Sequence, residues 1–117
     1  MNFYQKTMIA SALSAGVLAL GLSTQAVAAA DTAAQTLAKQ SGCLKCHAVD
    51  KKKDGPAYKE VAAKYKGKAN AVEKLTHHIT SGEKVKFEDG HEEDHKIVKS
   101  KDPAAIKNLV EWILSRQ

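Results

Sequence analysis

Methionine, cysteine and aromatic residues are scarce in this chain, and each shortage excludes a class of protein. Both methionines lie within the first eight residues, and aromatic side chains make up 5% of the sequence. Because aromatic side chains are too few to stack on the bases of a nucleic acid, we expect no nucleic-acid partner. The two cysteines, Cys43 and Cys46, would close a very small disulfide loop that restrains little of the unfolded chain. A domain stabilised mainly by disulfides is therefore excluded.

The first thirty residues have the pattern of a secretory signal peptide. Lys6 supplies a short positive region, residues 8–22 are apolar or small, and small-residue cleavage sites follow at 26–28 and 28–30. The apolar run is too short and too weakly flanked to favour a membrane span, although an uncleaved anchor is the alternative. We predict a cleaved signal peptide over 1–30, one domain over 31–117, a periplasmic location and no stable membrane insertion after cleavage.

Helix signals recur in the remaining domain and strand signals are nearly absent, which predicts an all-α fold. Thr32 and Gln35 fit a capping box that opens a first helix, expected to end at Gly42. A short second helix is expected over 57–65, followed by a glycine at Gly67 that suits its end.

Two further helices are predicted towards the C-terminus. Asn70 resembles an N-cap for a helix that ends near Gly82. Asp102 is a good N-cap for the last helix, and Pro103 suits its first position. The apolar residues that recur at helical spacing in this last helix are Ile106, Leu109, Val110, Ile113 and Leu114.

The stretch between Gly82 and Asp102 shows no convincing periodicity and is expected to be a long loop. Loops of this length are uncommon in a compact domain unless they are functional. This loop contains His91 and His95.

Residues Cys43 to His47 form C-x-x-C-H, the attachment signature of c-type haem. Two thiols at this spacing can add to the two vinyl groups of a haem, and the next histidine can present a nitrogen to the iron. A covalently bound haem also supplies the constraint that a small core needs. We predict one haem c, attached through Cys43 and Cys46, with His47 as an iron ligand.

Two other chemistries could use the same residues. A thiol–disulfide redox pair normally lies in a β/α fold with strands that this sequence lacks. Cys43, Cys46, His47 and a remote histidine could instead bind zinc, which would leave the long loop unexplained.

Three segments resemble the small bacterial class I cytochromes c related to cytochrome c-551. They read GCLKCHA over 42–48, GPAYKEVAAKY over 55–65 and LVEWILS over 109–115. The resemblance implies an all-α fold of about four helices around one haem, with the N- and C-terminal helices crossing. It also implies that the Pro56 carbonyl accepts a hydrogen bond from His47, and that the protein is an electron carrier with redox partner proteins, not an enzyme.

The chain departs from this family in the ligand on the other side of the iron. Members supply a methionine from the loop before the C-terminal helix, but both methionines here precede the predicted cleavage site. Counting back from Trp112 places His95 nearest to that position, whereas counting forward from Gly82 points to His91. We favour His95 as the sixth ligand, with His91 as the second candidate.

The other candidates are less favoured by the pattern. His77 and His78 are adjacent, so they point in different directions from a helix, and we expect both to be solvated. The remaining alternatives are that Lys96 is the sixth ligand of the iron or that the sixth position is vacant.

Two functions follow from these ligands. A haem held by two histidines is expected to carry one electron at a lower potential than its His/Met relatives. If the sixth ligand is absent or detaches on reduction, the haem would instead bind CO, NO or O2. The high charge of the long loop, which suggests weak packing, motivates this alternative.

Overall fold

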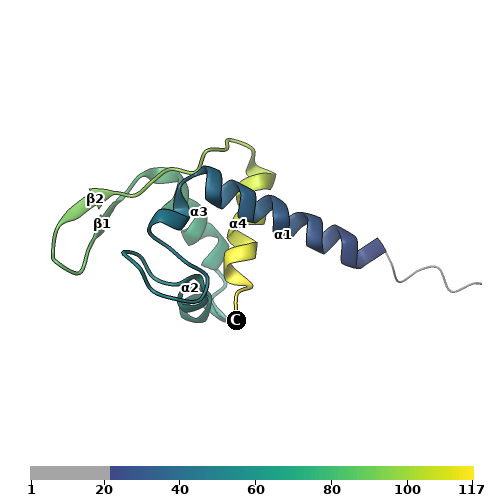
Figure 1. Ribbon diagram of the computed structural model, residues 1–117, viewed down its shortest axis with the longest axis horizontal. Coiled ribbons are helices and arrows are strands. Elements are labelled where there is room, and N and C mark those ends of the chain that lie inside the picture. Colours follow the sequence, from purple (N-terminus) through teal and green to yellow (C-terminus); the bar gives the residue numbers. More distant parts are fainter. Residues whose placement is uncertain (1–21) are drawn as a thin grey trace, which may run out of the picture.

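Four helices and one short hairpin make up the part of the chain that the structure describes. It is a computed structural model that describes residues 22–117. In chain order the elements are α1 (Leu22–Gln40), the 3-10 turn η1 (Cys43–Lys45), α2 (Tyr58–Tyr65), α3 (Ala71–Ser81), β1 (Lys84–Lys86), β2 (Glu92–Asp94) and α4 (Pro103–Leu114) (Figure 1). The predicted all-α class is confirmed.

Helix α1 begins well before the predicted capping box. The hydroxyl of Thr32 donates a hydrogen bond to the carbonyl of Ala28 at 2.9 Å, so Thr32 lies inside the helix and the predicted start there is wrong. Threonine can form either a cap or this backbone bond one turn earlier, and local sequence does not separate the two. The predicted signal peptide falls partly on residues 1–21, outside the described residues, and its predicted end at residue 30 lies inside α1. Its cleavage stays a prediction.

The core is built where α1 lies across α4 (Figure 1). Ala34 and Ala38 of α1 are 1% and 0% exposed, and Leu109 and Val110 of α4 are equally buried. Small alanine side chains let the two helix axes approach closely, and the larger side chains of α4 fill the contact. The side chain of Asn108 adds a hydrogen bond of 2.8 Å to the carbonyl of Ala30. The implied crossing of the N- and C-terminal helices is therefore present.

Two predicted helix ends, at Asp102 and Gly82, are confirmed, whereas Asn70 lies at the N-cap of α3 without a side-chain hydrogen bond. Asp102 accepts a hydrogen bond of 3.0 Å from the backbone N–H of Ala104, and Gly82 ends α3 in the left-handed conformation. The N-terminus of helix α2 is capped by a residue of its own first turn, because the Glu60 carboxylate accepts a hydrogen bond of 2.8 Å from the N–H of Ala57. None of the helices among the described residues is long and apolar enough to cross a membrane.

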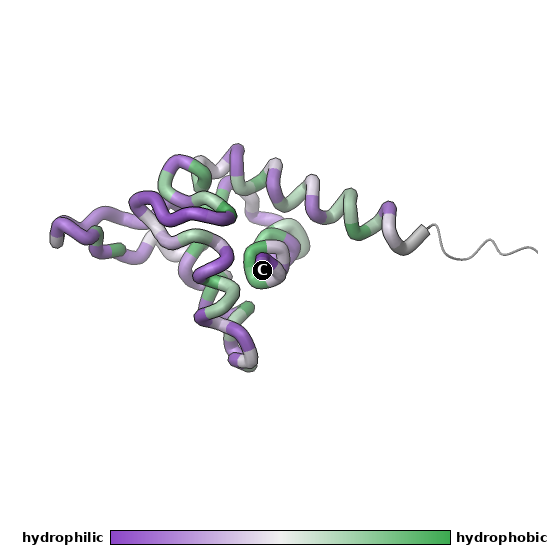
Figure 2. Tube along the Cα trace, turned by 60° about the horizontal axis from the view of Figure 1, so that its bottom comes forward, coloured by the Kyte–Doolittle hydropathy of each residue, from purple (hydrophilic) through white to green (hydrophobic). Residues whose placement is uncertain are grey.

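The predicted long loop contains a β-hairpin. Strands β1 and β2 are antiparallel, with Lys84 opposite Asp94 and Lys86 opposite Glu92. The hairpin is mostly hydrophilic, unlike α4, which is seen end on in Figure 2. Its strands have three residues each and carry mainly Lys, Glu and Asp, which are depleted in strands, so sequence pattern gave no sign of them.

We expect an enlarged side chain at the helix crossing to destabilise the fold. Ala38→Leu should lower the free energy of unfolding by about 1–3 kcal/mol, because the fully buried position has no room for three more carbons. Urea unfolding of the haem-loaded protein measures this. Ala33→Leu, at an exposed position of the same helix, is the matched control and should leave stability nearly unchanged. Equal stability of the two variants would contradict the tight crossing.

Candidate functional site

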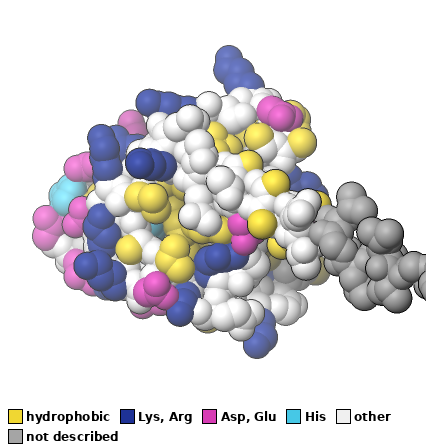
Figure 3. Space-filling model, turned by 45° about the vertical axis from the view of Figure 1, so that its right-hand side comes forward, with side chains coloured by type: hydrophobic (Ala, Val, Ile, Leu, Met, Phe, Trp, Pro, Cys, Tyr) yellow, Lys and Arg dark blue, Asp and Glu magenta, His cyan; other side chains and the backbone are white. Residues whose placement is uncertain are grey.

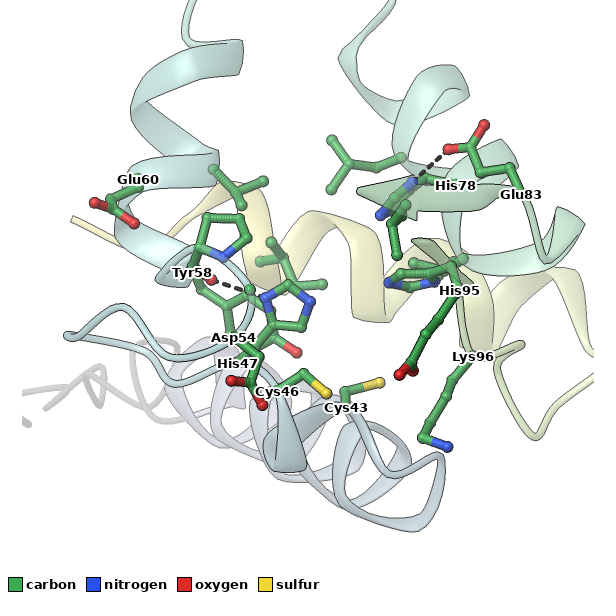
Figure 4. Close-up of a pocket in the computed structure, with 18 of the residues that line it drawn as sticks. Cys43, Cys46, His47, Asp54, Tyr58, Glu60, His78, Glu83, His95 and Lys96 are labelled. Carbon is green, nitrogen blue, oxygen red and sulfur yellow. Dashed lines mark hydrogen bonds and ion pairs between the residues drawn. The ribbon is translucent and has the colours of Figure 1, made fainter. Parts of the chain in front are cut away.

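A cavity of about 740 Å³ lies between the C-x-x-C-H segment and helices α2, α3 and α4. This volume is within the range of about 300–1,000 Å³ that is typical of cofactor and ligand sites. Both cysteines, His47 and His95 line it (Figure 4). Its apolar walls include Tyr58, Val61, Tyr65, Leu75, Ile79, Leu109 and Ile113.

The two cysteines are placed by the tight turn η1. Gly42 precedes the turn with a φ of 75°, and the N–H of His47 donates to the carbonyl of Cys43 at 2.9 Å. Both thiols are free and half-buried. Burial raises the pKa of the Cys43 thiol, which keeps it protonated at neutral pH in the unmodified chain. The thiols are therefore available for covalent attachment and not joined to each other.

His47 is held from three directions. Its Nδ1 donates a hydrogen bond of 2.8 Å to the carbonyl of Pro56, as the resemblance implies. The ring of Tyr58 stacks on it at a centroid distance of 5.4 Å. At Gly55 a Cβ atom would lie 2.5 Å from Cε1 of His47, so only glycine lets the backbone pass there. Burial lowers the pKa of His47, which favours the neutral imidazole that a metal requires.

The loop that carries Gly55 is tied back to the C-x-x-C-H segment. The N–H of Gly55 donates to the carbonyl of Cys46 at 2.8 Å, and the ammonium of Lys53 donates to the carbonyl of Leu44 at 2.8 Å. These bonds fix the loop that supports His47.

His95 faces His47 across the cavity (Figure 4). The two ring centroids are 6.2 Å apart and the planes are tilted by 55°. Two imidazoles bound at about 2 Å on opposite sides of one metal ion have centroids about 6.3 Å apart. The observed separation would therefore leave room for an iron ion held by both rings.

The ring of His95 is half-buried at the wall of the cavity. Its Nδ1 is buried and has no hydrogen-bond partner among the described residues. A buried nitrogen without a partner is costly. Burial lowers the pKa of His95, and His78 and His47 lower it further, so the imidazole is neutral and suited to a metal. The chemistry of the donor set, two thiols and two neutral imidazoles around an apolar cavity, fits a haem.

The backbone at His95 is firmly held, contrary to the expected weak packing. Its N–H donates to the carbonyl of Glu83 at 2.9 Å, which extends the register of the hairpin by one pair. Just beyond, the N–H of Val98 donates to the carbonyl of Ile79, also at 2.9 Å. The N–H of Lys99 then donates to Oγ of the buried Ser41 at 2.9 Å.

The second candidate, His91, lies outside the cavity. It projects from the hairpin, stacks on Phe87 at 4.3 Å, and is paired with the carboxylates of Asp89 and Glu93. Figure 3 shows a histidine among acidic side chains at one edge of the face in view. His91 is thus engaged in the hairpin and does not face His47.

The adjacent histidines of α3 have different surroundings. The side chain of His77 is 67% exposed, as predicted, whereas His78 is half-buried and lines the cavity. The expectation that both are solvated is therefore wrong for His78. Its position three residues after the buried Leu75, on the same helix face, is the signal that could have found it.

The two alternatives for the cysteines find no support in the described residues. They contain no group of three or more His, Cys, Asp and Glu side chains that could hold a metal ion such as zinc. Their only strands form the two-stranded hairpin, which does not provide the β/α setting of a thiol–disulfide pair.

Comparison with known proteins gives a consistent family. The family model for cytochrome c matches residues 32–117. Cytochrome c-551 of Allochromatium vinosum is 37% identical over 95 residues, which cover 81% of this chain and 98% of that protein. Cytochrome c-551 of Pseudomonas aeruginosa is 50% identical over 48 residues, which cover 41% of this chain and 46% of that protein, less than half its length.

Solved structures that resemble this chain are also cytochromes c. The class 1 cytochrome MtoD from Sideroxydans lithotrophicus ES-1 is 65% identical, with a TM-score of 0.69 and coverage of 72% of this chain and 92% of that one. Cytochrome c552 of Nitrosomonas europaea is 32% identical, with a TM-score of 0.56 and coverage of 71% and 99%. The chain therefore belongs to the cytochrome c family, as a small class I member with one covalently attached haem c that carries electrons and is not an enzyme.

Proposed function

We propose that this protein is a periplasmic electron carrier in which two histidines ligate the haem iron. Cys43 and Cys46 attach the haem, His47 is one axial ligand and His95 is the other. The observation that carries this proposal is the 6.2 Å separation of the His47 and His95 rings. Partner proteins deliver and remove one electron at a time.

Haem supplies the reversible one-electron change between iron(III) and iron(II). The chain keeps the surroundings of that change fixed. The Pro56 carbonyl and the Tyr58 ring hold His47 in place, and the apolar side chains of α2–α4 exclude water. Replacing a methionine thioether with imidazole should lower the reduction potential, since Met/His ligation raises it.

The periplasmic location rests on the N-terminal sequence. Residues 1–30 have the order of a secretory signal, and haem c is attached outside the cytoplasm. We propose that the signal is cleaved and that 31–117 form the working domain.

A second function has one observation in its favour. His95 lacks the hydrogen-bond partner that Pro56 gives to His47, so its ring is less restrained. If it left the iron on reduction, small ligands such as CO, NO or O2 could bind. The backbone hydrogen bonds that anchor the chain around His95 favour the first function, an electron carrier whose second histidine stays in place.

Removing the ring of His95 tests the ligation. Optical spectra of the haem-loaded protein should be low-spin when oxidised and when reduced, and CO should not change them. His95→Ala should give a high-spin form that takes up CO, because it removes the ring that faces His47 at a centroid distance of 6.2 Å. His91→Ala, which removes a histidine outside the cavity, is the control and should match the unsubstituted protein. Low-spin spectra and no CO uptake in His95→Ala would contradict the proposal, whereas CO uptake by the unsubstituted protein would favour the second function.

The close contact at Gly55 gives a separate test of His47. Gly55→Ala should displace the imidazole, because the added Cβ would lie 2.5 Å from its Cε1. The expected cost is about 1–3 kcal/mol of unfolding free energy, with an altered ferric spectrum. Gly67→Ala is the control, since that glycine has a φ of +75° but nothing within 4 Å. It should lose stability only through backbone strain and keep its spectrum. An unchanged spectrum in Gly55→Ala would argue against the assigned contact.

A further inference from the structure

A third imidazole lies beside the two proposed ligands. His78 reaches the cavity from α3, and its ring centroid is 4.1 Å from that of His95, with the planes tilted by 43° (Figure 4). Rings at this distance are in van der Waals contact. His78 therefore occupies space through which the His95 ring would pass if it rotated.

Glu83 holds both histidines in this arrangement. Its carboxylate is hydrogen-bonded to Nδ1 of His78, and its backbone carbonyl accepts the N–H of His95 at 2.9 Å. Its own N–H donates to Oγ of Ser81 at 3.2 Å, which ties it to the end of α3. One residue thus fastens the side chain of the first histidine and the backbone of the second.

His95 lacks the kind of side-chain restraint that fixes the opposite ligand. Its buried Nδ1 has no hydrogen-bond partner in the described chain, whereas Nδ1 of His47 is bonded to Pro56. Groups that touch a ligating histidine normally orient its ring. The backbone of Lys96 interacts with the ring of His95 without a hydrogen bond of normal geometry, and the side-chain ring that packs against it is that of His78.

We propose that His78, held by Glu83, is a positioning residue that fixes the rotation of the His95 ring and thereby the angle between the two axial imidazole planes. The angle between His47 and His95 is 55°. This inference rests on the proposed ligation of iron by His95. It assigns His78 no role as a ligand.

Electron paramagnetic resonance of the oxidised, haem-loaded protein tests this proposal. The g values of low-spin ferric haem depend on the angle between the axial imidazole planes. His78→Ala should stay low-spin but shift and broaden the low-field g signal, because the ring of His95 gains rotational freedom. The reduced variant should also begin to take up CO, which the unsubstituted protein does not, because a less restrained ligand leaves the iron more readily.

Four further variants separate positioning from general damage. His77→Ala removes the neighbouring, exposed imidazole, whose Nδ1 lies 3.7 Å from the Glu83 carboxylate, and should change neither readout because the bond between Glu83 and His78 remains. His78→Phe keeps a ring against His95 and should restore most of the original signal. Glu83→Ala should reproduce His78→Ala because it releases that ring, whereas Glu83→Gln keeps an oxygen acceptor and should not. Since the Glu83 side chain is exposed, these last two variants test the idea without disturbing the core.

The outcomes distinguish this inference from the proposed function. If His78→Ala matches His77→Ala in both readouts while His95→Ala becomes high-spin, the positioning role is wrong and the two-histidine carrier stands. If His78→Ala becomes high-spin and His95→Ala does not, His78 is itself the ligand and both proposals are wrong.

Discussion

The backbone at Gly55 and Pro56 passes close to the ring of His47 and restricts its orientation. A carbonyl lies 2.8 Å from its Nδ1, and no side chain fits on the glycine. Helix α2 starts directly after this contact, and its first residue, Tyr58, stacks on the same ring. Tyr58 then meets Trp112 of α4 edge to face at 5.6 Å. The position of one imidazole is thus linked by direct contacts to the helix that crosses α1.

The two sides of the cavity are built by different means. On the side of His47, steric exclusion and a side-chain hydrogen bond hold the ring itself. On the side of His95, hydrogen bonds hold the backbone, through Glu83 and, further along, through Val98 to α3. The ring of His47 is thus held by backbone atoms, whereas the ring of His95 packs against another side chain, that of His78.

The sequence predicted those parts of the molecule whose signals are local. Gly82 and Asp102 mark helix ends because left-handed backbone and side-chain caps depend on single residues. The position of His95 in the cavity was expected from counting back from Trp112. The start of α1 was missed because Thr32 can bond to the backbone in two ways. The contact of His78 with His95 was missed because it joins elements that only the fold brings together.

The hairpin was missed because its stability does not come from an alternating apolar pattern. An ion pair of 2.8 Å between Lys84 and Asp94 joins its strands, and bonds beyond β2 fasten the chain to α3 and to the end of α1. His95 lies just after β2, at the fastened end, while the exposed tip is at Gly90. The tip can consequently gain, lose or exchange residues without moving the imidazole in the cavity. Two cytochromes of this design could therefore differ widely in hairpin length and still place the same residue in the cavity, so alignments of such chains should be anchored at the base of the hairpin and not at its turn.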